Sequence, residues 1–491
     1  MSKAMHKGHI ARRPSARDHA QSVADDRGEG SVASAPESAL RRRLLAAAAS
    51  QPALALTAGG LAGLTVHDPA QAQAGGETTH SGAIRAASAD GSIPAYTGGL
   101  MKPPAGWTPE RGYIDPFPDE KPLFIITAAN AEQHKEFLSA GMMALLRRQP
   151  AFRMPVYRTH RTAGLPEKVI ADVLAETGKI TANGGSMSGH ARSTIPFPNP
   201  RTGEQAMLNH LMCYRGGGYE REYSWFPVRA NGESYRVGYT DRVVYAENIE
   251  PSQVDSGLQF AFTSAYTAPG ALAGTVYMVH EFKDPIRNPR AAWVYNAGQR
   301  RVRRAPDLAY DNVADGTEGM RVTDQYFAFN GALDRYDWKL LGRREMFVAY
   351  NTYRVGSKSL RYADVIGKGT VNSDLMRYEK HRVWVVEATL KKDSKHIYGK
   401  RVFLLDEDSW TVLAEDCYDT RGEIWRIGIH GFIQVYDQGV PWYSVQAWHD
   451  LSNGNVLISH LDNEVKKPIQ FGLKAPWSDF QTDALRRRGV R

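Results

Sequence analysis

The sequence predicts a mostly β protein of the α+β class, built around one large curved antiparallel sheet or open barrel with capping helices. Three observations predict this class. From residue 219 to residue 461 the chain is rich in Trp, Tyr, Val and Arg, and polar and apolar residues alternate as they do on strands. The runs are short and mostly joined by brief turns, two of which contain Asn-Gly, at 231–232 and 453–454. No segment repeats with a fixed period, which argues against a propeller or a solenoid.

The first 74 residues indicate export. Residues 1–40 are polar and charge-mixed, and we expect them to be a disordered extension. Residues 41–74 have the features of a signal peptide: three arginines, an uncharged Ala/Leu-rich stretch at 44–66, and the small-x-small site Ala72-x-Ala74. We therefore expect a periplasmic protein that is cleaved near Ala74. The pair Arg42-Arg43 resembles a twin-arginine signal, but Arg41 stands where Ser or Thr is usual, so ordinary Sec export stays open. An uncleaved membrane anchor is the third possibility.

The composition of the remaining chain excludes several classes of partner. The full chain has 491 residues and a formal charge of +8. Residues 1–74 hold nine Lys/Arg and six Asp/Glu, so the other 417 residues carry a charge of +5, with no basic block typical of nucleic-acid binding. We therefore expect no nucleic-acid partner, and no integral membrane segment in the mature chain. The two cysteines, Cys213 and Cys417, could pair in the periplasm or remain as buried free thiols.

Helices are expected before the strands. Residues 75–125 are rich in Gly, Pro and Thr and predict an extended arm. Helical spacing of apolar residues predicts helices within 128–150 and 165–176, and a short one at 205–212, with a loop at 183–204 between them. We interpret residues 126–491 as one domain in which the helices cap the sheet as a lid.

The strands follow in quick succession. The first hairpin joins 223–228 to 235–239, and the last joins 442–449 to 455–461. Between these hairpins we expect strands at 274–282, 292–295, 300–304, 345–351, 382–390, 400–405, 410–416, 423–429 and 432–437.

The sequence offers no catalytic or metal-binding constellation. The loop at 184–190 lacks a serine placed as in a nucleophile elbow. Asp406-Glu407-Asp408 begins like a calcium loop, but Trp410 and Thr411 occupy the places of the next ligand and the turn glycine, so a turn between strands is expected. The histidines lack HExxH spacing, and no phosphate loop or dinucleotide fingerprint occurs. We therefore expect no catalytic residue, no metal and no cofactor.

Aromatic residues on the expected strands are the unusual feature. They can form ordinary sheet core, or they can line a concave face that binds an apolar ligand. Trp293 and Tyr295, two residues apart, should share one face of a strand. Arg301 and Arg303 should also share a face, either as a charged edge that blunts the sheet or as a rim for an anionic head group. The predicted ligand-binding residues are Trp293, Tyr295, Trp384, Phe403, Trp425, Arg301 and Arg303.

Several segments resemble domain-of-unknown-function family 1329, a family of exported bacterial proteins. They are 91–100 (GSIPAYTGGL), 199–203 (NPRTG), 282–295, 298–306 (GQRRVRRAP), 378–384 (YEKHRVW), 406–410 and 419–422. The last three, which hold a strand, an acidic turn and then Asp-x-x-Gly, also look like part of the periplasmic lipoprotein-sorting carriers (LolA/LolB-like). The resemblance implies an incomplete β-barrel whose open side is covered by helices and whose cavity holds acyl chains. The chain is more than twice as long as those carriers, so extra strands or lids must exist.

The resulting hypothesis is a soluble periplasmic carrier that binds a hydrophobic or amphiphilic ligand, such as a lipid or a lipoprotein acyl chain, and serves envelope transport. It would not be an enzyme. The alternative is an exported enzyme acting on a lipid or a hydrophobic aromatic compound, which would need titratable groups clustered on the cavity. A third possibility is a structural partner of an envelope transporter complex.

Overall fold

A computed structural model describes residues 77–189, 192, 194–306 and 308–489. Residues 63–491 group into one compact unit, and everything below concerns its described part. The disordered extension predicted for 1–40 and the export signal predicted for 41–74 lie outside the described residues. Within them, no helix is long and apolar enough to cross a membrane.

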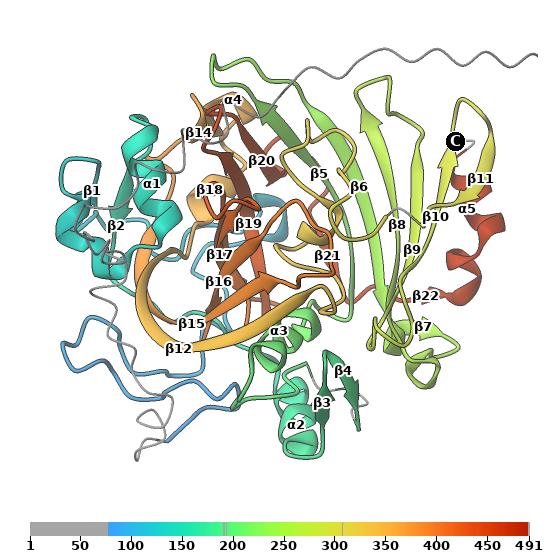
Figure 1. The fold of residues 1–491 in the computed structure, drawn as a ribbon, viewed down its shortest axis with the longest axis horizontal. Helices are drawn as coiled ribbons and strands as arrows, with labels where there is room; N and C mark the ends of the chain where they lie inside the picture. The colour runs from blue at the N-terminus through green and yellow to red at the C-terminus, as the bar shows by residue number, and fades with distance from the viewer. Residues whose placement is uncertain (1–76, 190–191, 193, 307, 490–491) are drawn as a thin grey trace, which may run out of the picture. The chain divides into compact units, whose positions relative to one another are not determined.

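The described residues form a sheet of 16 strands, and this confirms the expected fold class. Its long strands follow the order β12-β15-β16-β17-β18-β19-β20-β5-β6-β8-β9-β10-β11, and each of these pairs is antiparallel. Figure 1 shows the strands turning from β12 and β15 on one side to β10 and β11 on the other. The sheet does not close, because β11 and β12 do not pair.

The bounds of the long strands are β5 Gly218–Val228, β6 Val237–Tyr245, β8 Leu258–Ala268, β9 Val276–Phe282, β10 Ala291–Asn296, β11 Arg301–Arg304, β12 Tyr336–Ala349, β15 Tyr378–Leu390, β16 Lys400–Asp406, β17 Val412–Tyr418, β18 Ile424–Val435, β19 Val440–Asp450 and β20 Val456–Leu461. The short strands are β1 Phe124–Ile126, β2 Met154–Val156, β3 Thr181–Asn183, β4 Ser186–Ser188, β7 Ile249–Glu250, β13 Ile366–Gly367, β14 Thr370–Val371, β21 Gln470–Phe471 and β22 Ala475–Pro476. The α-helices are α1 Ala140–Arg148, α2 Glu167–Glu176, α3 Gly203–Met212, α4 Tyr362–Val365 and α5 Thr482–Gly489.

Irregular pairing accompanies the curvature of the sheet. Register shifts occur between β12 and β15 at Leu340/Gly342, between β18 and β19 at Gly431/Phe432, and between β20 and β5 at Ile458/Leu461. Gly342 has φ +93°, which a residue without a side chain adopts readily. Bulges of this kind bend a strand and increase its twist, so long strands such as β12 and β18 can curve without breaking.

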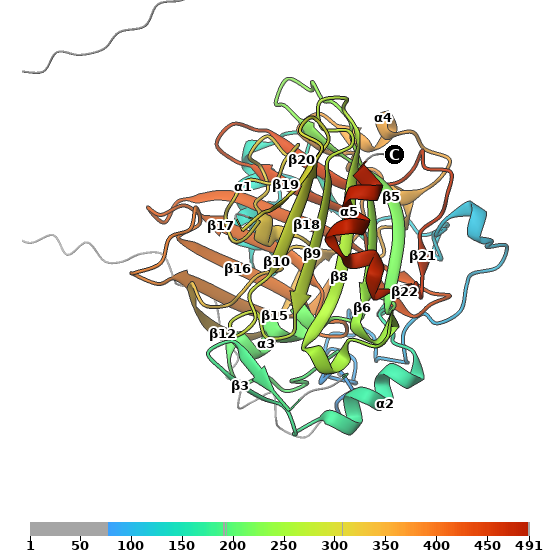
Figure 2. The ribbon, with the colours of Figure 1, turned by 90° about the vertical axis from the view of Figure 1, so that its right-hand side faces the viewer.

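The pairing register defines two faces of the sheet. We call one the inner face, because the segment between β11 and β12, residues 308–335, lies against it; we call this segment the inner segment. The outer face carries α1 against β17 and β18, and α5 against β9, β10 and β11 (Figure 2). Side chains of the inner face include Trp384, Phe403, Glu415, Trp448, Trp225, Tyr223, Tyr239 and Val294.

The helices cap the sheet from both faces. The helix expected within 128–150 is divided into a 3₁₀ helix at Ala131–Phe137 and α1, because Ser139 starts α1 by accepting a hydrogen bond from the Met142 amide. The expected helix at 165–176 is α2, and the expected short helix is α3, which packs on β12 and β15. The covering helix α5 was not expected from the sequence.

Three strand assignments differ from the expectation. β8 was missed, because its sequence LQFAFTSAYTA places alanines between the aromatic residues, so polar and apolar residues do not alternate regularly. Residues 423–437 were expected to form two strands, but β18 is one strand interrupted by its bulge at Gly431/Phe432. The expected strand at 345–351 is the second half of β12, which starts at Tyr336.

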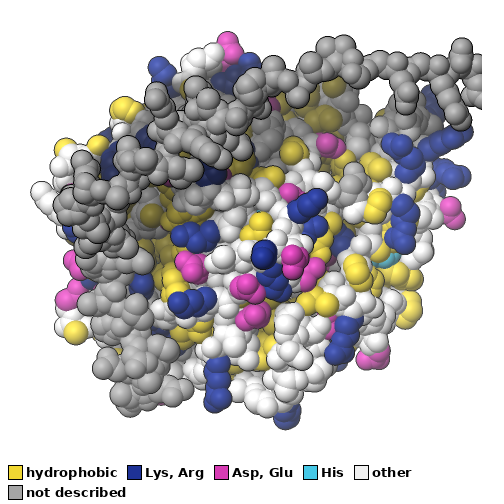
Figure 3. All heavy atoms as spheres, viewed as in Figure 1, with side chains coloured by type: hydrophobic (Ala, Val, Ile, Leu, Met, Phe, Trp, Pro, Cys, Tyr) yellow, Lys and Arg dark blue, Asp and Glu magenta, His cyan; other side chains and the backbone are white. Residues whose placement is uncertain are grey.

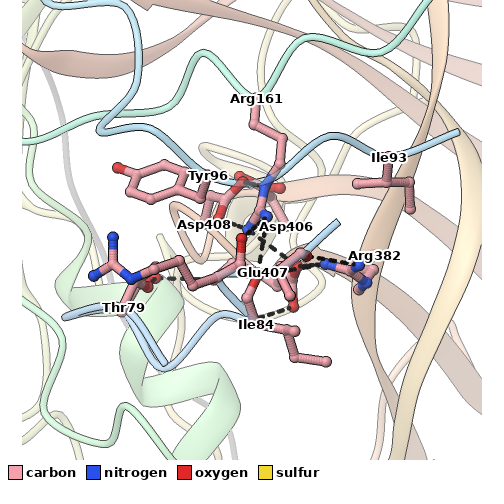
Figure 4. A network of polar contacts seen from close by, with 12 residues as sticks. Thr79, Ile84, Ile93, Tyr96, Arg161, Arg382, Asp406, Glu407 and Asp408 are labelled. Carbon is pink, nitrogen blue, oxygen red and sulfur yellow. Dashed lines mark hydrogen bonds and ion pairs between the residues drawn. The ribbon is translucent and has the colours of Figure 1, made fainter. Parts of the chain in front are cut away.

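The chain between residues 77 and 123 is mostly turns and extended backbone, and it is fastened to the turn between β16 and β17 (Figure 4). In that turn, Asp408 accepts two hydrogen bonds from Arg161, at 2.6 and 2.9 Å. Glu407 is ion-paired with Arg382 and accepts a hydrogen bond from the Ile84 amide. The acidic turn is buried, and its partners mark it as a structural anchor for residues 77–100.

Candidate ligand-binding site

The inner segment is held to the inner face by buried ion pairs. Arg401 on β16 is fully buried between Asp324 of the inner segment, at 3.1 Å, and Glu415 on β17, at 2.9 Å. His396 lies 3.1 Å from Asp324, and Gln325 donates a hydrogen bond of 2.7 Å to Glu415. Because each carboxylate has several donors, the inner segment is fixed to the middle of the sheet.

Aromatic contacts extend this attachment. Phe327 of the inner segment packs edge-on against Tyr219 and Trp442 of the inner face. The Tyr326 ring stacks on Phe262 with centroids 5.7 Å apart. The middle of the inner face is therefore filled by the chain itself, and free space remains on either side of this filled region.

The first space, the arm-side hollow, has a volume of about 630 Å³. Its walls come from the arm, from β5, β19 and β20, and from the loop at 468–474. Its aromatic lining consists of Trp107, Tyr113, Tyr223, Tyr353, Trp442, Tyr443 and Phe471. His460 also lines it, and burial, together with the charges of Arg221 and Arg321, holds the pKa of this imidazole well below its usual range.

The second space, the edge-side hollow, has a volume of about 560 Å³ and lies between the inner segment and strands β6 to β11. Tyr223 lines both hollows. The floor of the edge-side hollow is made of aromatic and aliphatic side chains on successive strands: Tyr239, Phe262, Tyr266, Tyr277, Val279 and Val294. The inner segment supplies the roof, which includes Leu308, Val313, Arg321 and Tyr326. Six charged residues also line the hollow: Glu281, Arg290, Arg303, Arg304, Asp315 and Arg321. An aromatic and aliphatic floor beside charged side chains suits an amphiphilic ligand.

The charged groups of the edge-side hollow differ in their partners. Glu281 and Arg290 form an ion pair of 2.6 Å, and Asn330 donates to the same carboxylate oxygen. Asp315 accepts a hydrogen bond from the Tyr277 hydroxyl. Arg321 is buried over the rings of Trp225 and Trp448, and within the described part of the chain no carboxylate pairs with it.

The five aromatic residues predicted from the sequence occupy three separate places. Trp293 and Tyr295 share one face, as expected, but it is the outer face, where α5 covers them. Trp384 and Phe403 lie on the inner face and pack with α3 and with residues 328–338. Trp425 lies at the start of β18, where its indole donates to Asp450. None of the five lines either of the two hollows, so their role in ligand binding stays a prediction.

The two predicted arginines lie on the inner face of the edge strand β11. Arg303 is paired with Val294 and Arg301 with Asn296, which places both on the same face, as expected. Arg303 lines the edge-side hollow, while Arg301 is exposed and does not. Figure 3 shows Lys and Arg side chains gathered on the side of the molecule where Figure 1 labels β11 and α5.

The residues that best define the hollow were not singled out from the sequence. Tyr266 and Phe262 lie on the missed strand β8, and Arg321 lies in a segment with no regular strand pattern. The one available signal was the alternation that places Tyr277 and Val279 on one face of β9.

Titratable groups do converge on the inner face, but they are engaged with one another. Asp324, Glu415 and His396 are buried under the inner segment and line neither hollow. Cys213 and Cys417 are both buried and free, and burial raises the pKa of each thiol. Among the residues that the structure describes, no group of His, Cys, Asp and Glu side chains is arranged to hold a metal ion.

The fold and hollows define a protein with an open, mostly antiparallel sheet and an aromatic interior. The chain belongs to the family described as "Protein of unknown function (DUF1329)", whose model matches residues 125–486. An uncharacterized protein of Pseudomonas aeruginosa is 41% identical over 426 residues, covering 86% of this chain and 93% of that relative. The resemblance expected from the sequence is thereby confirmed.

Two solved structures match part of this chain. A DUF1329 family protein from Desulfovibrio piger is 14% identical, with a TM-score of 0.39, and the match covers 57% of this chain and 95% of that structure. A LolA superfamily protein from Nitrosomonas europaea is 12% identical, with a TM-score of 0.35, and the match covers 58% of this chain and all of that structure (100%).

Proposed function

We propose that the protein is a periplasmic carrier that binds a hydrophobic or amphiphilic molecule in the edge-side hollow. The observation that supports this most is the floor of that hollow, in which Tyr239, Phe262, Tyr266 and Tyr277 from three neighbouring strands face one space. Burying an apolar chain there would contribute roughly 25 cal/mol per Å² before the costs of ordering the ligand.

Binding explains the site better than catalysis does. A hydrolytic or acid–base mechanism needs titratable groups that reach the ligand. Here the carboxylates of Asp324 and Glu415 are ion-paired with Arg401 and line neither hollow. The Glu281 carboxylate, which does line the hollow, is held by Arg290 and Asn330.

The proposal is tested by filling the hollow. Val294 is half-buried on β10 and borders the hollow, so the larger side chain of Val294→Phe should occupy ligand space. We expect this variant to bind a fluorescent fatty-acid probe about tenfold more weakly, which corresponds to the loss of about two buried methylene groups. Lys339→Phe, on an exposed position of β12, is the matched control and should bind the probe like the unaltered protein.

Two results would contradict the proposal. The first is equal probe binding by the Val294→Phe variant, with its thermal stability intact. The second is the absence of any co-purified lipid or aromatic compound when organic extracts of protein isolated from its native periplasm are analysed by mass spectrometry.

A further inference from the structure

Arg321 is a buried guanidinium that lacks an anionic partner. Its exposed fraction is 9%, its Nε has no hydrogen-bond partner, and its contacts are with the rings of Trp225, at 5.3 Å, and Trp448, at 5.9 Å. Burying a charge without a counter-charge costs several kcal/mol, so such a residue calls for an explanation.

Four other arginines, all buried or partly buried, each have the ion-pair or hydrogen-bond partner that Arg321 lacks among the described residues. Arg221 on the same inner face is paired with Asp241 at 3.0 Å. Arg290 is paired with Glu281, and Arg401 with Asp324 and Glu415. Arg215, which has no carboxylate, donates to the Pro441 carbonyl instead. In contrast to these four, Arg321 reaches neither a carboxylate nor a carbonyl in the described part of the chain.

The position of Arg321 places its charge at one end of the edge-side hollow. Trp225, which it covers, lies on β5, and the lining continues from β5 through β6, β8, β9 and β10 to the edge strand β11. At about 4.8 Å between neighbouring strands, the path from β6 to β11 is about 19 Å long. This is enough for the hydrocarbon part of a long-chain amphiphile to lie across the aromatic floor.

The charge of Arg321 is felt by the rings that line this end. Burial raises the pKa of Tyr239 and of Tyr266, and the charges of Asp241 and Asp315 raise them further; the positive charge of Arg321 acts against these rises and is the weaker influence. An anionic group within hydrogen-bond distance of the Arg321 guanidinium would be attracted by a charge that water screens weakly, because this side chain is buried.

We propose that Arg321 binds the acidic head group of the carried molecule, a carboxylate or a phosphate, so that the ligand is an anionic amphiphile held head-inward with its chain directed toward β11. This inference rests on the proposed function, since it concerns the same hollow. A guanidinium suits this role because it can donate two parallel hydrogen bonds to one carboxylate or phosphate group.

The test compares a fluorescent long-chain fatty acid with its methyl ester, which has the same chain but no charge. The exported protein, freed of bound lipid, should bind the acid about tenfold or more tightly than the ester. The Arg321→Gln variant should bind both probes equally, with ester affinity unchanged. Arg201→Gln, at an exposed arginine that lines neither hollow, should keep the preference for the acid. Inorganic phosphate should not displace the fatty acid, because it lacks the chain.

Each outcome of this comparison supports or contradicts the role of Arg321. Equal binding of acid and ester by the unaltered protein overturns the inference while leaving the proposed carrier intact, and it needs no variant that might unfold. A preference for the acid that persists in Arg321→Gln also overturns it. Arg321→Lys, which keeps the charge, should retain part of the preference if Arg321→Gln proves unstable. Displacement by phosphate alone would mark a free-anion site instead, and failure of both probes to bind contradicts the proposed function itself.

Discussion

Aromatic residues of the inner face differ in whether their rings are packed or border free space. Trp384 and Phe403 form packed core, whereas Tyr266 and Tyr277, whose types are no more unusual, border free space. The difference lies in what stands opposite each ring: α3 and the inner segment in the first case, a hollow in the second. Residue type and alternation predict on which face a ring lies, but not whether a distant loop will cover it.

The ion pairs around Arg401 provide the first prediction at this scale. Asp324→Ala removes one partner of a fully buried guanidinium, so we expect the free energy of unfolding to fall by about 3–5 kcal/mol. Denaturant unfolding measures this change. Amide exchange of residues 322–330 should also become faster, because the inner segment loses its main anchor.

The control for this prediction is Asp337→Ala, which removes an exposed carboxylate on β12 and should change the free energy of unfolding by less than about 0.5 kcal/mol. Equal effects of the two substitutions would contradict the anchoring role of Asp324.

Trp384 tests the distinction between core and lining. Its ring is buried and stacks on Trp410 with centroids 5.8 Å apart. We expect Trp384→Ala to lower the free energy of unfolding by about 3–5 kcal/mol through the void that it leaves. Binding of a fluorescent fatty-acid probe by the folded fraction should not change. Weakened probe binding with little loss of stability would instead support the ligand-binding role predicted from the sequence.

Helix α1 is attached to the sheet through its N-terminus as well as through its apolar face. The start of α1 is joined to β17 by Asp416, which accepts hydrogen bonds from the Ser139 hydroxyl at 2.8 Å and the Gly141 amide at 2.9 Å. A carboxylate at a helix N-terminus is favourable for the helix. Here, however, the carboxyl group is buried, and burial raises the pKa of Asp416 to about 6.

This raised pKa predicts a pH dependence. The folded protein binds a proton at Asp416 more tightly than the unfolded chain does, whose carboxyl has its ordinary pKa of 3.8. The contribution of this group to stability is therefore complete below pH 4 and is lost as the pH rises through about 6. The difference amounts to about 3 kcal/mol at most.

The measurement is the free energy of unfolding from pH 4 to pH 7 for the unaltered protein and for Asp416→Asn. Other buried carboxyls contribute with the same sign, since burial also raises the pKa of Asp406 and of Glu407, so only the difference between the two proteins is diagnostic. We expect a smaller fall in stability with pH for Asp416→Asn. Parallel curves for the two proteins would show that Asp416 does not titrate in this range.

The elements themselves were largely predictable from the sequence. The hairpins around Asn231-Gly232 and Asn453-Gly454 and the helices α1, α2 and α3 follow from turn residues and apolar spacing. α5 was not foreseen, because its sequence TDALRRRG has only two apolar residues, Ala484 and Leu485, which it buries against the outer face. β8 was missed because local alternation is weak where both faces of a strand are buried.

At the scale of the whole sheet, the expected single curved antiparallel sheet is confirmed. What the sequence did not predict is which residues fill the concave face and where free space remains. The inner segment has little regular structure, and its position depends on contacts with Arg401 and Glu415, which lie 77 or more residues away in the chain. Such contacts leave no periodic signal. The division of the concave face into two hollows therefore became visible only in three dimensions.

The central claim is that the edge-side hollow holds the ligand, and photoaffinity labelling with a diazirine-bearing fatty acid tests it most directly. The labelled protein is digested, and the modified residues are located by mass spectrometry. The account predicts labels on β8, β9 and β10 and on the inner segment, around Tyr266, Tyr277, Val294 and Arg321, and their loss in the Val294→Phe variant. Labels confined to the arm-side hollow, around Trp107 and Phe471, or scattered over the exposed surface, would contradict it.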